Sequence, residues 1–274
     1  MAERDVPVTT GTYRVLTKHL TFSESTEEHT TMAPDNRIAR TAGLLYLIMV
    51  VTGMFSLAYV PSHIDTHADA LATTGHIVTS LSLFRWGTLS ELIMAAAFLM
   101  LPLILYQLLH HVNRNLAALM VVLVAVSIPI SFVNVAHKLD ILSLLGNTDV
   151  SQVFTRDQLN AQVMMHLVDY RNGTLVSEIF WGLWLLPFGY LVFKSTFLPR
   201  ILGVLLMLGG FSYLIDFSGT MLFPGYGGTT LAGLIMLPAS LGEIGTCLWL
   251  LIIGTRHRTR QSTDASTDTQ WSGA

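Results

Sequence analysis

Residues 116–136 read LAALMVVLVAVSIPISFVNVA and contain no Asp, Glu, Lys or Arg. An α-helix rises ~1.5 Å per residue, so a helix of this length crosses the ~30 Å hydrocarbon core of a bilayer. The stretch therefore predicts a membrane-spanning helix. Further charge-free stretches occupy residues 41–64, 92–113 and 217–242, which extends the same interpretation over most of the chain.

The composition of the whole chain is that of a membrane protein. Only 12% of the 274 residues are charged and 51% are hydrophobic, whereas soluble domains carry about 25% charged residues. These values exclude a soluble globular domain. A formal charge of −3 without a basic face excludes nucleic-acid binding, and the single cysteine, Cys247, excludes a disulfide-stapled secreted domain.

We predict an all-α fold, an integral membrane bundle of six transmembrane helices. The predicted spans are Thr41–Val60, Trp86–Leu109, Leu116–Ala136, Thr174–Phe193, Ile201–Leu222 and Leu231–Ile253. We expect the third to continue outside the bilayer to about Leu145, and a helical stretch from Ala161 to lead into the fourth.

Polar segments flank this membrane domain, which covers residues 37–255. Residues 1–36 and 256–274 are polar and the N-terminal segment lacks an apolar signal-peptide region, so we predict a disordered N-terminal tail and a disordered cytoplasmic C-terminal tail. Met32 opens the sequence MAPDNRIAR, a natural start nine residues before the first span. We therefore expect residues 1–31 to be an upstream start-codon extension or a dispensable tail.

Lys and Arg residues near the span ends indicate the orientation. One side of the predicted bundle collects Arg37, Arg40, Arg114, Lys194, Arg200, Arg256, Arg258 and Arg260. The opposite side has Arg85, Lys138, Arg156 and Arg171. This two-to-one bias places both termini in the cytoplasm, and we expect a multi-pass protein of the cell inner (plasma) membrane.

Four carboxylates fall inside the predicted spans: Glu91, Glu178, Asp216 and Glu243. A charged side chain at mid-membrane costs ~2.5–3.5 kcal/mol on insertion scales, so such residues usually face the bundle interior or water. At ~1.5 Å per residue, three of them lie roughly 6–9 Å from the outer ends of their spans, and Glu243 lies about 18 Å deep. We predict an acidic layer in the outer third of the membrane, with Glu243 near the midplane below it.

Polar side chains at helical spacing accompany these carboxylates. One stripe on the third span consists of Ser127, Ser131, Asn134 and Lys138, and another on the approach to the fourth consists of His166, Tyr170, Gly173 and Ser177. If these faces converge, Lys138 and Arg171 neutralise part of the acidic layer. The candidate polar cluster is therefore Glu91, Glu178, Asp216, Glu243, Lys138, His166 and Arg171.

Known catalytic and cofactor motifs are absent from the sequence, which has no HExxH, GxSxG, Walker loop or CxxC. We therefore expect no cofactor and identify no catalytic residue. His63 and His67 would share one helix face, which is adequate for a metal pair, but the sequence places no third ligand with them. Whether the chain binds a metal stays open.

Proline, glycine and tryptophan residues inside the spans indicate how the helices pack more than they indicate a chemical role. Internal prolines are Pro102, Pro129, Pro187 and Pro238, which are either static kinks or hinges around a cavity. The small residues Gly203, Gly209, Gly210, Gly242 and Gly245 predict close contacts in the fifth and sixth spans. We expect Trp181 and Trp184 to pack between helices.

Several segments of the chain are similar to one known family. They are residues 37–46 (RIARTAGLLY), 189–203 (GYLVFKSTFLPRILG), 213–216 (YLID), 224–226 (PGY) and 242–251 (GEIGTCLWLL). Over about residues 35–255 the chain resembles the bacterial multi-pass membrane family catalogued as domain of unknown function 4386, most specifically in the Phe-Leu-Pro-Arg connection.

This resemblance implies the same topology and cytoplasmic basic loop, with Arg200, Asp216 and Glu243 as family-typical residues. The family often carries a His in the fourth span where this chain has Trp184, which weakens any proposal of a metal held there. The resemblance implies no known activity.

Three functions stay open at this point. The carboxylate layer and kinked spans favour transport of a small solute or proton-linked ion through an outward-facing acidic cavity. The first alternative is an intramembrane enzyme that uses the carboxylates and His166 on a lipid-like substrate. The second is a structural or partner-binding component whose polar residues only hold the bundle together. The sequence favours a non-enzymatic role, with the lipid bilayer and a small-molecule or ion ligand as partners.

Overall fold

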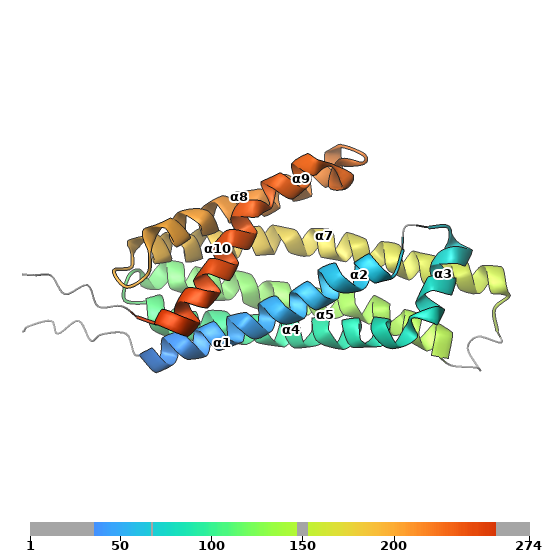
Figure 1. Ribbon diagram of the computed structural model, residues 1–274, viewed down its shortest axis with the longest axis horizontal. Coiled ribbons are helices and arrows are strands. Elements are labelled where there is room, and N and C mark those ends of the chain that lie inside the picture. Colours follow the sequence, from blue (N-terminus) through green and yellow to red (C-terminus); the bar gives the residue numbers. More distant parts are fainter. Residues whose placement is uncertain (1–35, 67, 147–152, 256–274) are drawn as a thin grey trace, which may run out of the picture. The chain divides into compact units, whose positions relative to one another are not determined.

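The computed structural model describes residues 36–66, 68–146 and 153–255 (Figure 1). Within this part of the chain every regular element is a helix, and there is no strand. Six segments are long and apolar enough to cross a membrane: Asn36–His63, Leu81–Leu109, Arg114–Gly146, Arg156–Lys194, Arg200–Leu222 and Thr230–Ile253. The predicted six-span, all-α membrane fold is confirmed. His67 and the predicted tails lie outside the described residues, except Asn36, which the prediction places in the tail but which begins the first helix.

Four of the spans are single helices, and the first and last are composite. The single helices are α4 (Leu81–Leu109), α5 (Arg114–Gly146), α7 (Arg156–Lys194) and α8 (Arg200–Leu222). The first span joins α1 (Asn36–Gly53), the π-helix η1 (Met54–Tyr59) and α2 (Val60–His63). The last joins α9 (Thr230–Ile235), α10 (Leu237–Leu248) and the π-helix η3 (Trp249–Ile253). Between spans lie α3 (Ala70–Thr79) and the 3-10 turn η2 (Tyr226–Gly228).

The six spans form a ring in chain order. Helix α1 packs on α4, α4 on α5, α5 on α7, α7 on α8 and α8 on α10, and α10 with η3 returns to α1. Figure 1 shows this return, where the red end of the last span crosses the blue beginning of α1. Short connections favour such packing of successive antiparallel helices.

Aromatic side chains fill the interior of the ring. Tyr46, Trp184 and Phe188 are at most 2% exposed, and Phe98 is 7% exposed. The Trp184 ring stacks on Phe188 with centroids 5.1 Å apart and meets Phe98 edge-on at 5.2 Å. Trp184 therefore packs between helices, and these contacts join α1, α4 and α7 across the ring.

Two helices extend well beyond their hydropathic spans. Helix α5 has 33 residues and α7 has 39, which correspond to ~50 Å and ~58 Å against the ~30 Å of hydrocarbon. The start of α7 is fixed by a capping box, in which Thr155 Oγ1 accepts from the Gln158 N–H at 3.3 Å and Gln158 Oε1 accepts from the Thr155 N–H at 2.9 Å. The predicted extensions of the third and fourth spans are thus present, and α7 begins five residues before Ala161.

The extended ends of α5 and α7 share a second apolar cluster with α3 and the beginning of α4. We call this part of the fold the cap. Its buried side chains are Val60, Ile64, Ile77, Phe84, Ile141, Leu144, Val163 and Leu167. The apolar surface buried here supports helix segments too polar to span a membrane by themselves.

The prolines have two different local effects. Pro102, Pro129 and Pro187 lie inside continuous helices, as the sequence predicts. Pro238 instead lies in the first turn of α10, directly after the helix is interrupted at Met236. Because proline has no N–H to donate, it fits the first turn of a helix and favours a restart at this point.

Glycines allow the backbones of α7 and α8 to touch. A Cβ atom added at Gly189 would lie 2.7 Å from the carbonyl oxygen of Gly203, and one at Gly210 would lie 2.8 Å from that of Gly182. Both helices thus place two glycines seven residues apart at the same interface. This arrangement is the close helix contact that small residues permit in membranes.

The return of the last span to α1 depends on a similar approach, which we call the seam. A Cβ atom at Gly43 would lie 2.7 Å from the Leu251 Cα. Beside it, Cys247 is 1% exposed and its Sγ lies 3.7 Å from the Gly43 carbonyl oxygen, to which the thiol donates a weak hydrogen bond. The seam closes the ring.

Substitution of Gly189 by Ala is expected to lower the unfolding midpoint of the protein in detergent, because overpacking a tight contact costs ~1–3 kcal/mol. The matched control is Gly233→Ala in α9, where an added Cβ meets nothing within 4 Å. Intrinsic tryptophan fluorescence during heating measures both midpoints. Equal midpoints for the two variants would contradict the proposed backbone contact.

Candidate functional site

The seven side chains predicted as one polar cluster lie in separate places in the fold. One carboxylate pairs with the lysine, three carboxylates gather around α8, and the histidine and the arginine each have other neighbours. The members of the first group are Glu91 and Lys138, and those of the second are Glu178, Asp216 and Glu243.

The first group is a buried ion pair with an aromatic partner. Lys138 Nζ on α5 lies 2.5 Å from Glu91 Oε2 on α4, and both side chains are more than nine-tenths buried. Tyr170 on α7 donates its hydroxyl to Glu91 Oε1 at 2.9 Å, and its ring centroid lies 3.9 Å from Lys138 Nζ. Removing two charges from water is costly unless further hydrogen bonds satisfy them, as they do here. The group joins α4, α5 and α7.

The two predicted polar stripes meet along the contact between α5 and α7. Asn134 Nδ2 donates to Thr174 Oγ1 at 3.0 Å, one turn away from the cation–π contact of Lys138 with Tyr170. Glycine is required opposite the amide, because a Cβ at Gly173 would collide with Asn134 Oδ1. The stripes therefore bind two helices to each other and do not line an open channel at this level.

The second group surrounds Tyr213 on α8. Its hydroxyl donates to Glu243 Oε1 at 3.3 Å, and the Tyr46 hydroxyl donates to Glu243 Oε2 at 3.3 Å. Glu178 and Asp216 are close enough to interact electrostatically with each other and with Tyr213. Among the described residues, no Lys or Arg forms an ion pair with any of these three carboxylates.

Glu243 lies in the wall of a partly open cavity of about 210 Å³ that is lined by residues of α1 and η1, α4, α7, α8 and α10. The wall is largely apolar. Its aromatic and methionine residues are Phe98, Trp181, Trp184, Tyr213, Met49, Met54 and Met94. Among the described residues that line the cavity, Glu243 is the only acidic or basic one. The buried aromatic cluster around Tyr46 and Trp184 forms one boundary of this space.

Both composite spans contribute to the cavity where their helices are irregular. Gly53, Met54 and Leu57 line it at the junction of α1 with the π-helix η1. Ser240 and Glu243 line it within two turns of the interruption at Met236. Irregular helix segments occur frequently at functional sites, and binding sites in membrane transporters are typically built on discontinuous helices.

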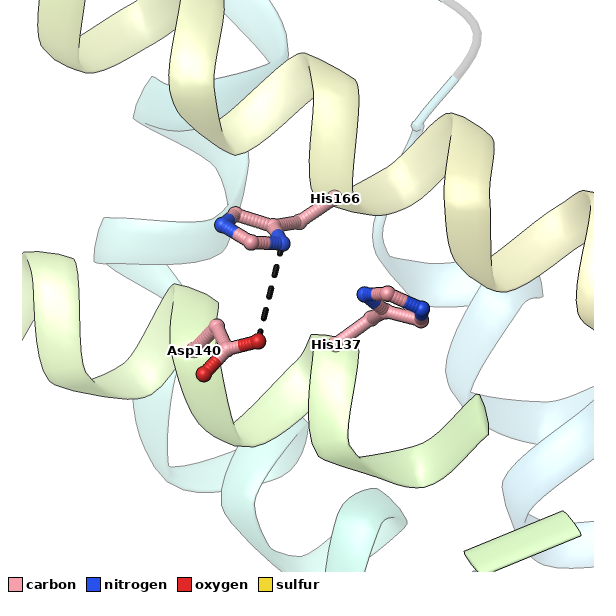
Figure 2. A group of neighbouring side chains, drawn as sticks. All are labelled: His137, Asp140 and His166. Atoms are coloured by element: carbon pink, nitrogen blue, oxygen red, sulfur yellow. Dashed lines mark ion pairs between the residues drawn. The ribbon is translucent and has the colours of Figure 1, made fainter. Parts of the chain in front are cut away.

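His166 and Arg171 lie away from the carboxylates of the second group. His166 Nδ1 is 3.7 Å from Asp140 Oδ2, and its ring centroid is 5.8 Å from that of His137 (Figure 2). The exposed Arg171 reaches from α7 toward the connection between α2 and α3, where its Nη1 donates to the Thr66 carbonyl oxygen at 3.5 Å. The geometry thus separates His166 from Glu178 and Asp216, the acid–base partners that the enzyme alternative requires.

The predicted site residues do not include the tyrosines that donate hydrogen bonds to Glu243, nor two neighbours of His166. Tyr46 and Tyr213 are ordinary interior aromatics by position, and only their contacts with Glu243 reveal a polar role. His137 and Asp140 follow the predicted third span and are not among the predicted site residues, although their three-residue spacing places them on one helix face. That spacing is the signal that could have identified them.

Comparison with known proteins yields one family. A family model described as domain of unknown function (DUF4386) matches residues 41–254, more than three quarters of the chain. No curated protein and no solved structure matches.

Replacing Lys138 by Met is expected to destabilise the protein by ~3–5 kcal/mol, because Glu91 then stays buried without its partner. The double variant Glu91→Leu/Lys138→Met should recover most of this loss, since both charges are absent. Unfolding midpoints in detergent measure the effect, with Lys194→Met at an exposed lysine as the control. A double variant as unstable as the single one would contradict the pairing.

Proposed function

Because this chain belongs to the DUF4386 family, whose description assigns no activity, we propose its function from the Glu243 cavity: the protein binds a small amphiphilic cation within the membrane and exchanges it for protons across the bilayer. Besides this cation, the expected partner of the protein is the lipid bilayer in which it lies. The distribution of Lys and Arg favours the inner membrane, with both termini in the cytoplasm.

One observation carries this proposal: the cavity combines a single carboxylate with a wall of aromatic and methionine side chains. A cation near the face of an aromatic ring gains ~2 kcal/mol or more when desolvated. The carboxylate adds a direct charge interaction that the low dielectric of the site strengthens. An apolar body with one positive charge matches such a wall better than an anion or a sugar does.

The size of the cavity limits the ligand. An engineered cavity of ~150 Å³ holds benzene, so about 210 Å³ accommodates a ring with a short cationic substituent.

Proton exchange follows from the surroundings of Glu243. Tyr46 and Tyr213 donate neutral hydrogen bonds to its two oxygens, and no described Lys or Arg balances its charge. A buried carboxylate without a cation is costly, so release of a bound cation favours uptake of a proton.

Movement of the cavity walls is expected where the helices are irregular. The π-helix η1 and the interruption at Met236 leave backbone groups outside the regular α-helical pattern. The Gly-mediated contact of α7 with α8 and the ion pair between α4 and α5 hold the opposite walls. The first and last spans are therefore the ones we expect to move during exchange.

Binding of benzyltrimethylammonium tests the cation site. Trp181 and Trp184 line the cavity, so the cation should quench their fluorescence in the detergent-purified protein. Glu243→Gln should weaken this binding at least tenfold, about 1.4 kcal/mol. Glu178→Gln is the matched control, since Glu178 is not part of the wall.

The neutral isostere neopentylbenzene separates charge recognition from apolar binding. Its affinity should be equal in the native protein and in Glu243→Gln, because it makes no charge interaction. Equal weakening of the cation and the isostere by Glu243→Gln would instead indicate collapse of the cavity, and would contradict a charge-selective site.

Transport is tested in liposomes that contain the protein. An outward-directed proton gradient should drive uptake of benzyltrimethylammonium, with potassium and valinomycin clamping the membrane potential. Glu243→Gln should abolish both cation uptake and the accompanying proton efflux, whereas Glu178→Gln should retain cation uptake. Uptake that is independent of the proton gradient would contradict exchange, even if binding is observed.

A further inference from the structure

A second group of chemically active side chains lies between α5 and α7, away from the Glu243 cavity. His137 and Asp140 project from α5, and His166 projects from the facing surface of α7 (Figure 2). Each offers one ligand atom, and these three atoms lie within 4.8 Å of one another. The group thus brings two imidazoles and one carboxylate to one point.

The two imidazoles carry unsatisfied nitrogen atoms. The Nδ1 atoms of His137 and His166 are both buried from solvent and have no hydrogen-bond partner. In the tautomer that carries its proton on Nε2, each Nδ1 presents a lone pair. Buried polar atoms are nearly always paired, so two orphaned nitrogens in one group call for an acceptor of those lone pairs.

We propose that His137, Asp140 and His166 bind a divalent transition-metal ion, with water completing the coordination shell. Imidazole nitrogen and carboxylate oxygen are the ligands that Zn²⁺ and related borderline ions prefer, and two histidines with one carboxylate form a known three-ligand arrangement with open positions. The spacing of His137 and Asp140, i and i+3 on one helix, also recurs in metal sites of helical bundles.

The distances need only a small contraction. Ligand atoms at ~2.0–2.1 Å from a tetrahedral ion are about 3.3 Å apart, and His166 Nδ1 already lies 3.7 Å from Asp140 Oδ2. Side-chain rotation without movement of α5 or α7 can close the rest. The capping box at the start of α7 and the apolar cap hold both helices in place.

Access and charge at this position suit a cation. The Asp140 side chain is 54% exposed and that of His166 is 24% exposed, so an ion can enter from water, whereas the Nδ1 atoms of the two imidazoles are buried. Lys138, adjacent to His137 in the chain, has its charge paired with Glu91. The nearest lysine therefore does not repel a bound cation.

Zn²⁺ alone, added to the metal-stripped full-length protein in detergent, tests the proposal. Competition with a chromogenic zinc indicator should reveal one ion per chain. His137→Gln, His166→Gln and Asp140→Asn should each weaken binding at least tenfold. Two matched controls, His63→Gln and Asp169→Asn, should bind as the native protein does, because both residues are exposed and outside the group.

Co²⁺ gives a spectroscopic check, since its visible absorption bands should show imidazole coordination in the native protein and change in the three variants. A third measurement uses the native chain alone: Zn²⁺ should protect His137 and His166, but not His63, from modification by diethyl pyrocarbonate. Because it needs no substitution, this measurement tests the metal site even if a variant fails to fold. Absence of saturable Zn²⁺ binding, binding unchanged in the variants, or no selective protection would each overturn the proposal.

Discussion

The ion pair between Lys138 and Glu91 is the interaction on which the organisation of the other charges depends. Lys138 is a buried cation of the described part of the chain, and it contacts a Glu91 oxygen and the ring of Tyr170, so that the group joins three helices. Because Lys138 is paired with Glu91, it does not balance the carboxylates near α8, and no other Lys or Arg in the described part of the chain forms an ion pair with them.

The contacts between helices divide the bundle into a tightly joined part and a less regular part. Helices α4, α5, α7 and α8 are joined by a buried ion pair, by Asn134 and Thr174, and by direct glycine contacts. The first and last spans contain π-helical segments and an interruption, and they meet at the seam and at the hydrogen bond from Tyr46 to Glu243. The cavity lies between these two parts, so we expect its shape to change when the first and last spans move.

Sequence reasoning could predict the spans because hydropathy is a property of single residues and lipid solvates each of them independently. It could not predict partners. Glu91 and Lys138 are 47 positions apart, and Tyr46 and Glu243 are 197 apart, so their meeting depends on how helices rotate about their axes. Span position predicts a similar depth for Glu91, Glu178 and Asp216, but Glu91 pairs with Lys138, whereas Glu178 and Asp216 lie near each other beside Tyr213. The position of a residue along its span can be predicted from the sequence. The direction in which its side chain points depends on the rotation of the helix about its axis, which is set by packing such as the glycine contacts of α7 with α8.

The seam between α1 and α10 contains the only cysteine of the chain, Cys247, buried against Gly43. The reactivity of this thiol therefore measures the separation of the first and last spans. A thiol-reactive label reaches this sulfur only while the first and last spans are apart, so the labelling rate counts separation events without any engineered residue. Since every other position lacks a thiol, the label reacts at this one site, and where labelling is faster than reclosing its rate equals the rate at which the ring opens.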